Sequence, residues 1–149
     1  LRVFGQPGRL DLNMGLNFAY NLSNQNTFDA TFAKFLDDSY SYWTIGAGPA
    51  ATLSWGGVKT PSWTSASLRW SRQSYMGRLV QDGDGVYGGA TQRHDRYAFA
   101  LAYGYPIAPQ FTMTARANFL WATSNHKYQK GYTYDYRAAN YLIGVAYEY

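Results

Sequence analysis

Apolar and polar residues alternate without a break from Leu10 to Leu22. Every second residue in this segment is Leu, Met, Phe or Tyr, and the residues between them are Asp, Asn, Gly or Ala. Successive side chains of an extended strand point to opposite faces, so the alternation predicts a β-strand. Strands of soluble proteins average about 5–6 residues, whereas a tilted membrane-spanning strand needs about 9–11. The length of this segment therefore favours a membrane-spanning strand.

The same period of two recurs along the rest of the chain. It is interrupted by short segments rich in Gly, Pro, Asn and Ser, which are typical of turns. We therefore predict an all-β fold built from antiparallel strands. Seven strands are expected, at residues 10–22, 28–32, 42–55, 63–75, 97–105, 111–121 and 140–149, with long polar loops at 76–95 and 123–135.

Aromatic residues, which make up 19% of the chain, concentrate near the ends of the predicted strands. Amphipathic rings favour the depth of lipid headgroups, so two aromatic belts around apolar strand centres indicate an up-and-down transmembrane β-barrel. Because soluble antiparallel sheets also alternate, a soluble β-sandwich is the alternative fold. One predicted belt contains Tyr20, Phe28, Trp55, Trp63, Tyr105, Phe111, Tyr147 and Tyr149, and the other Tyr42, Trp43, Tyr75, Tyr97, Trp121 and Tyr141.

The composition excludes several other classes of protein. There is no Cys, so a disulfide scaffold, a zinc ribbon and a thiol catalyst are impossible. The apolar stretches are far shorter than the ~18 residues of a membrane-spanning helix. Charged residues form only 15% of the chain, and the aromatic content argues against disorder. We expect neither a cofactor nor a metal.

The number of predicted strands bears on completeness. If the two long loops face outward, the last strand descends and ends inside, and with seven strands the first also descends, placing residues 1–9 outside. Bacterial single-chain barrels have an even number of strands, and an open sheet edge in lipid is prohibitive. We therefore expect residues 1–149 to be a single domain that forms the C-terminal part of a larger barrel.

The end of the chain resembles the C-terminal assembly signal of bacterial outer-membrane barrels. The signal consists of a Gly, two further residues, and then aromatic, any residue, aromatic, as in Gly144 through Tyr147 to Tyr149; Leu142 departs from it, because a polar residue is usual there. The resemblance implies recognition by the barrel assembly machinery. More loosely, Arg93 to Tyr149 resembles the barrels of the surface lipoprotein assembly modifier group and related export barrels, which implies translocation of a protein or polymer.

Two groups of candidate site residues follow from this topology. Inward-facing charges and amides can tune a pore or pair with one another across the lumen; these lumen-lining candidates are Asp11, Asn13, Asn17, Asp29, Arg69, Arg116, Asn118 and Glu148. Guanidinium groups bind phosphate well, so basic residues at the outer rim are either a lipopolysaccharide-binding rim or ordinary solvated loop charge. These rim candidates are Arg72, Arg78, Arg93, Lys127, Lys130 and Arg137.

The predicted function is an outer-membrane pore or translocation barrel, a porin-like transport protein of the bacterial outer membrane. A closed structural or adhesive barrel whose outer loops bind partners is the first alternative, and a soluble β-sandwich binding module is the second. No enzyme is expected, although His94 beside Asp95 and Ser124 near His126 could serve as a base with its partner. Expected partners are outer-membrane lipid, lipopolysaccharide, the assembly machinery and an exported cargo or periplasmic partner; nucleic acid is not expected.

Overall fold

The structure, a computed structural model, describes residues 1–29, 33–57, 60–128, 130 and 133–147, and those residues form an all-β fold without a helix. This confirms the predicted fold class at the level of an antiparallel all-β protein. The strands are β1 (Arg2–Val3), β2 (Gln6–Asn21), β3 (Thr27–Asp29), β4 (Lys34–Leu36), β5 (Tyr42–Gly56), β6 (Pro61–Gln81), β7 (Tyr87–Ala108), β8 (Phe111–Ser124) and β9 (Tyr136–Tyr147).

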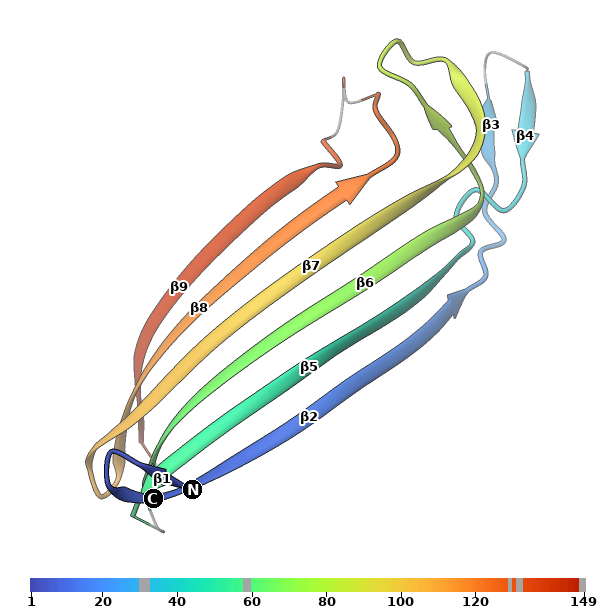
Figure 1. Ribbon diagram of the computed structural model, residues 1–149. Coiled ribbons are helices and arrows are strands. Elements are labelled where there is room, and N and C mark those ends of the chain that lie inside the picture. The colour runs from blue at the N-terminus through green and yellow to red at the C-terminus, as the bar shows by residue number, and fades with distance from the viewer. Residues whose placement is uncertain (30–32, 58–59, 129, 131–132, 148–149) are drawn as a thin grey trace.

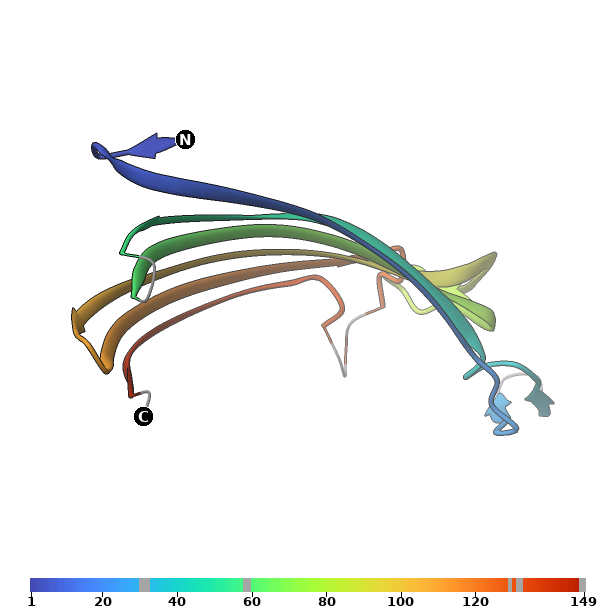
Figure 2. The same ribbon diagram turned by 90° about the horizontal axis from the view of Figure 1, so that it is seen from below.

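One large sheet contains seven of these strands in the order β1-β2-β5-β6-β7-β8-β9. All pairs are antiparallel, and each of the six long strands pairs with the next long strand along the chain. Figure 1 shows these strands running side by side, and Figure 2 shows that the sheet is strongly curved. Within the described residues, β9 pairs only with β8, and β2 has only the two-residue β1 on its other side, so the sheet does not close.

The two ends of the sheet differ in the length of their connections. At one end, here called the turn end, β5 joins β6, β7 joins β8, β2 begins and β9 ends (Figure 1). At the other, the loop end, lie the connections from β2 to β5, from β6 to β7 and from β8 to β9. Residues 1–9 therefore lie at the opposite end of the sheet from the long loops, and the prediction that they lie at the same end as those loops is wrong.

The predicted strand at 28–32 is the source of that error. Phe28 pairs with Phe35 in a separate two-stranded hairpin of β3 and β4, while β2 pairs directly with β5; residues 30–32 lie outside the described part of the chain. An apolar alternation of three residues is compatible with a short hairpin as well as with a sheet strand. Removing this strand reverses the predicted direction of β2, and it moves Tyr20 to the loop end, opposite Trp43.

The predicted loop at 76–95 is also wrong, because β6 continues to Gln81 and β7 begins at Tyr87. Only residues 82–86 connect them, and the Asp82 carboxylate accepts the backbone N–H groups of Asp84 and Val86, each at 2.9 Å. In the extension of β6 the apolar residues Met76, Leu79 and Val80 follow no period of two, so it lacks the alternation that marks the other strands. The predicted loop at 123–135 agrees with the connection from β8 to β9.

The extended part of β6 also holds the connection from β4 to β5. The N–H of Met76 donates to the carbonyl of Ser41 at 3.0 Å, and that of Gly77 donates to the carbonyl of Asp38 at 3.2 Å. A Cβ on Gly77 would lie 2.3 Å from the carbonyl oxygen of Asp37, so only Gly allows this approach. The long loop end is therefore attached to the sheet by backbone hydrogen bonds.

Candidate functional site

The register of the sheet separates two faces with different chemistry. On one, here called the apolar face, Leu12 lies opposite Ala51, Ala51 opposite Ala66, and the row continues through Leu101 and Ala117. Its large side chains are open to the surroundings: Leu16 is 78% exposed and Ile143 is 85% exposed. Among the described hydrophobic residues, only Ala122 is fully buried. The sheet thus has no core between two layers.

Six of the eight predicted lumen-lining residues belong to the long strands and share the opposite face, here called the polar face. The register places these six together on alternate positions of β2, β6 and β8. Asp29 is not among them, because it pairs with Lys34 in the separate hairpin and its side chain lies outside the described part of the structure. Glu148 also lies outside the described residues. The six are Asp11, Asn13, Asn17, Arg69, Arg116 and Asn118.

Side chains on the polar face meet across strands. The Arg69 guanidinium donates to Asn17 Oδ1 at 3.1 Å, although β6 and β2 are separated by β5. Gly46 of β5 lies beneath this contact, and a Cβ there would come 2.5 Å from Asn17 Oδ1. Asn118 donates to Asn140 at 2.7 Å, and Asp11 forms an ion pair with Arg9 at 2.8 Å. Asp11 thus pairs with a cation on its own strand and Arg69 has a neutral partner, so none of the ion pairs among the described residues joins two of the predicted lumen-lining charges.

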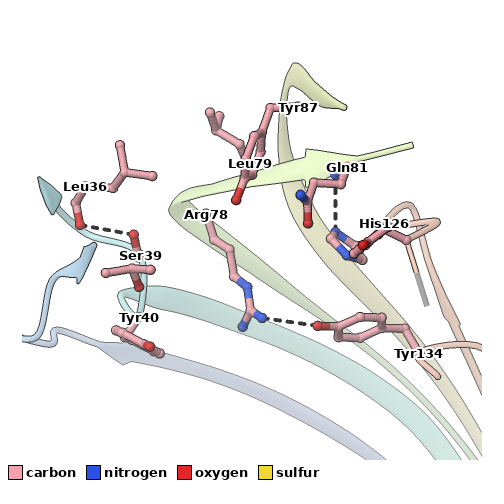
Figure 3. Close-up of a pocket in the computed structure, with 11 residues that line it drawn as sticks. Leu36, Ser39, Tyr40, Arg78, Leu79, Gln81, Tyr87, His126 and Tyr134 are labelled. Atoms are coloured by element: carbon pink, nitrogen blue, oxygen red, sulfur yellow. Dashed lines mark hydrogen bonds between the residues drawn. The ribbon is translucent and has the colours of Figure 1, made fainter. Parts of the chain in front are cut away.

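A cluster of rings closes the polar face at the loop end. Tyr134 stacks on His94 with 5.2 Å between ring centroids, and it contacts His126 edge-on at 4.8 Å. Arg78 donates to the Tyr134 hydroxyl at 3.1 Å, and the N–H of Gln81 donates to His126 Nδ1 at 3.3 Å (Figure 3). These residues come from β6, β7 and the connection before β9, so sequence spacing alone could not bring them together.

Two cavities adjoin this cluster. The first, of about 300 Å³, has Leu36, Ser39 and Tyr40 on one side and Arg78 with Tyr134 on the other (Figure 3). The second, of about 380 Å³, lies on the polar face. Both contain Arg78, which therefore stands between them. The residues that line the second cavity are Gln73, Tyr75, Arg78, His94, Arg96, Ala122, Tyr134 and Tyr136.

The two histidines of the cluster are neutral at ordinary pH. Burial, together with the charges of Arg96 and Arg78, lowers the pKa of His94 to about 4. Burial also lowers the pKa of His126, against a hydrogen bond with the backbone of Tyr128 that raises it. Gln92 is fully buried, with its amide nitrogen 3.0 Å from His94 Nε2 and its oxygen without a partner among the described atoms.

The predicted basic rim residues do lie at the loop end, but some lie on the apolar face, one lies on the polar-face side and two lie in the connection before β9. Arg72, Arg93 and Arg137 occupy apolar-face positions, opposite Asp95, Ser74 and Trp121. Arg78 lies on the polar-face side. Lys127 pairs with Asp135 at 3.0 Å, and Lys130 lies over the ring of Tyr128.

Two of these basic residues form ion pairs with carboxylates, Lys127 with Asp135 and Arg72 with Asp95. Desolvation acts to raise the pKa of Asp135, but hydrogen bonds from Lys127 and the Ser124 N–H outweigh it, so the pKa is lowered. Arg72 binds both carboxylate oxygens of Asp95, at 2.8 and 3.1 Å, which raises the pKa of its guanidinium. The six residues therefore do not form one basic cluster.

The geometry offers little to the predicted catalytic pairs or to a metal. Asp95 points to the apolar face and His94 to the polar face, because they are neighbours in one strand. Ser124 Oγ donates to the carbonyl of Arg93 and accepts the N–H of His126, so it is occupied by backbone groups. No group of three or more His, Asp or Glu suited to a metal ion occurs within the described ranges.

None of the chain's described segments forms a helix long and apolar enough to cross a membrane. Neither a protein-family model, nor a curated protein, nor a solved structure matches this chain.

Proposed function

We propose that this chain forms part of the wall of a bacterial outer-membrane β-barrel that acts as a pore or translocation channel. The observation that carries the proposal is the difference between the two faces of one long-stranded sheet. One face presents large exposed apolar side chains, and the other presents small and polar ones. A single exposed apolar patch of this extent in water is an aggregation hazard, whereas hydrocarbon lipid solvates it.

The length of the apolar band suits a bilayer. On β7 the band runs from Tyr97 to Tyr105, with Phe99, Leu101 and Tyr103 between them on the same face. A tilted membrane-spanning strand needs about 9–11 residues, and aromatic residues at both ends suit the two interfaces. In this proposal the membrane-spanning segments are residues 10–20, 43–55, 62–70, 97–105, 111–121 and 139–147, and the ring cluster lies outside them.

The aromatic residues of the belt at the loop end shift along the strands, toward the turn end, from β2 to β9. Such a shift is expected where the strands of a barrel are tilted. Tyr20 and Trp43 lie opposite each other, but Trp70 lies opposite Ala47, four residues along β5 from Trp43. Tyr97 and Trp121 then keep the level of Trp70, and Tyr141 lies opposite Ala117, another four residues along.

A drift of eight residues at about 3.4 Å each, over five strand spacings of about 4.8 Å, corresponds to a strand tilt near 45–50°. Barrel strands tilt by about 35–45° to the membrane normal. If the strands are tilted by this angle, the aromatic residues of the belt all lie at one depth in the membrane. In an untilted sheet the same drift would place them at different depths.

The unpaired edges of β2 and β9 require further strands in lipid. Open edges leave unsatisfied N–H and C=O groups, which cost several kcal/mol each in hydrocarbon. The six long strands are fewer than the eight or more of bacterial barrels, so strands from a longer polypeptide or from a second copy complete the wall. Gly144 and Tyr147 at the end of β9 then belong to the proposed assembly signal; Tyr147 packs against Phe111 at 5.0 Å, and Tyr149 lies outside the described residues.

In this arrangement the loop end faces outward, beyond the aromatic belt. Arg72, Arg93 and Arg137 then lie where the phosphorylated glycolipid of the outer leaflet begins, and they are the residues we propose for lipopolysaccharide contact. Lys127, Lys130 and Arg78 belong to the loops and the channel mouth instead. The ion pair with Asp95 leaves Arg72 the weakest of the three candidates for binding phosphate.

A second candidate function is a closed barrel whose loops bind a partner. The β3–β4 hairpin favours it, because Phe28 and Phe35 are exposed and pack edge-to-face on each other at 5.2 Å at the loop end. Two exposed rings on a projecting hairpin suit contact with another protein. Channel conductance separates this candidate from a pore.

The membrane position can be tested with the tryptophans. Trp55 and Trp63 lie at the same level of the β5–β6 pair, opposite Ser62 and Ser54, and project from opposite faces. Two variants of the full-length protein, each retaining one of them with every other tryptophan replaced by Phe, are reconstituted into vesicles containing brominated phospholipid. Quenching of Trp55 but not of Trp63 supports the proposal, and equal quenching or none contradicts it. Stepwise conductance of the same protein in a planar bilayer then supports a pore over a closed barrel.

A further inference from the structure

Three arginines of the polar face lie on neighbouring strands, and none of them forms an ion pair within the described residues. Arg96 lies opposite Ser71 of β6, Arg69 lies opposite Ala98 of β7, and Arg116 lies opposite Ala102. Along β7 these levels are two and then four residues apart, or about 7 Å and about 14 Å. All three positions belong to the face that the proposed function turns toward the lumen.

A fourth arginine extends this line to the channel mouth. Arg78 lines the cavity of about 380 Å³ together with Arg96, His94 and Tyr134. It lies closer to the loop end than Arg96, because its neighbour Leu79 pairs with Thr91. The four residues Arg78, Arg96, Arg69 and Arg116, here called the arginine track, thus descend from the loop end toward the turn end.

In the described part of the chain, every carboxylate that forms an ion pair has a partner other than the arginine track. The three ion pairs of that part are Arg9–Asp11, Arg72–Asp95 and Lys127–Asp135, and none includes a residue of the track. Arg69 and Arg78 donate instead to neutral oxygens, on Asn17 and Tyr134. Asp95 is on the other face of the sheet, and the two histidines near the mouth carry a lowered pKa and stay neutral.

We propose that the arginine track makes this channel selective for anions, so that its solutes are small anionic molecules such as carboxylates and phosphates. This inference rests on the proposed pore. A guanidinium group offers a planar fork of donors that matches carboxylate and phosphate oxygens, and it stays charged at all relevant pH values. Water in the lumen solvates neighbouring guanidinium groups, so they remain charged without paired carboxylates. A row of such groups gives an anion successive binding positions along the channel.

The expected effect of one arginine can be worked out from its charge. An anion passing about 7 Å from a guanidinium in a water-filled lumen is concentrated about threefold by Coulomb attraction, and a cation is depleted about threefold. Salt screens this attraction over about 10 Å at 0.1 M and about 3 Å at 1 M. Selectivity is therefore expected at low salt and is largely lost at 1 M.

The test measures the reversal potential of the full-length protein in a planar bilayer under a KCl gradient centred near 0.1 M. The wild type is expected to pass Cl⁻ several-fold better than K⁺. Arg69→Gln and Arg116→Gln are each expected to lower that permeability ratio about threefold or more, and the double variant further. Arg69→Lys, which keeps the charge, should preserve the preference and controls for damage to the fold. Arg2→Gln is the matched control, because it removes the same charge from the exposed β1, outside the arginine track.

The outcomes separate the two proposals. Channels that prefer K⁺, or whose selectivity is unchanged by Arg69→Gln and Arg116→Gln, would overturn the anion inference and leave the pore intact. Protein that inserts but never conducts overturns the pore, and with it the inference. If Arg2→Gln lowers the ratio as much as Arg69→Gln does, the effect comes from overall charge, and the arginine track is refuted.

Discussion

Leu101→Arg places a charge at the centre of the proposed membrane band. Leu101 lies midway between Tyr97 and Tyr105 on β7, with Ala66 and Ala117 as its neighbours on the two adjoining strands. Its side chain is 44% exposed on the apolar face, so nothing in the protein shields a replacement from lipid. An arginine at the lipid-facing midplane of a barrel costs about 2–4 kcal/mol. Since 1.4 kcal/mol is tenfold, the folding equilibrium should fall by about 30- to 700-fold.

Ala100→Arg is the matched control for this substitution. Ala100 is the preceding residue of the same strand and lies on the polar face, opposite Ser67 and Asn118. There the guanidinium meets water, and we expect a change of at most about 1 kcal/mol, as for other surface substitutions. Both variants are compared by reversible urea titration in lipid vesicles, followed by tryptophan fluorescence. The reasoning is refuted if Ala100→Arg destabilises the protein as much as Leu101→Arg, because the two faces would then see the same medium.

Three further predictions concern single contacts. Gly104→Val should cost about 1–3 kcal/mol in urea titration, because a Cβ there lies 2.3 Å from the Trp63 indole nitrogen; adding Trp63→Ala should restore part of the loss, and no recovery would contradict the clash. Asp95→Asn should lower the unfolding free energy more than Asp11→Asn does, since the Asp95 carboxylate is less exposed and binds Arg72 through both oxygens, whereas the exposed pair of Asp11 should change it by under about 1 kcal/mol. His94 has a folded-state pKa of about 4, below its ordinary 6.5, so the unfolded chain binds the proton first; stability should be complete above pH 6.5 and fall toward pH 4, and His94→Gln should flatten that slope in unfolding titrations.

The extension of β6 and β7 beyond the alternating segments shows why part of the fold could not be predicted from alternation. Period-two patterning arises where one face of a strand meets an apolar medium. Met76 to Gln81 lies beyond that level, and its partners are the backbone of residues 38–41 and the extended start of β7. Only these tertiary hydrogen bonds identify the segment as strand.

The candidate site also has features that the sequence predicts and features that it does not. Arg69 and Arg116 could be assigned to one face from the alternation within their strands. That neither arginine has a carboxylate partner among the described residues could not be predicted from the sequence. It depends on Asp11 pairing with Arg9 and on Asp95 lying on the opposite face. The ring cluster around Tyr134 was missed altogether, since its members come from three distant segments and no local pattern links them.

The sequence by itself determined the all-β class, the two faces of each long strand and the aromatic residues at the strand ends. These properties are local, because the side-chain period of a strand is two whatever lies beside it. The tertiary structure decided which strands are neighbours, that Phe28 belongs to a separate hairpin, and that β2 and β9 begin and end at the same end of the sheet. Strand pairing and strand direction are non-local properties. One short segment wrongly assigned as a strand of the sheet inverts the predicted direction of every strand that precedes it.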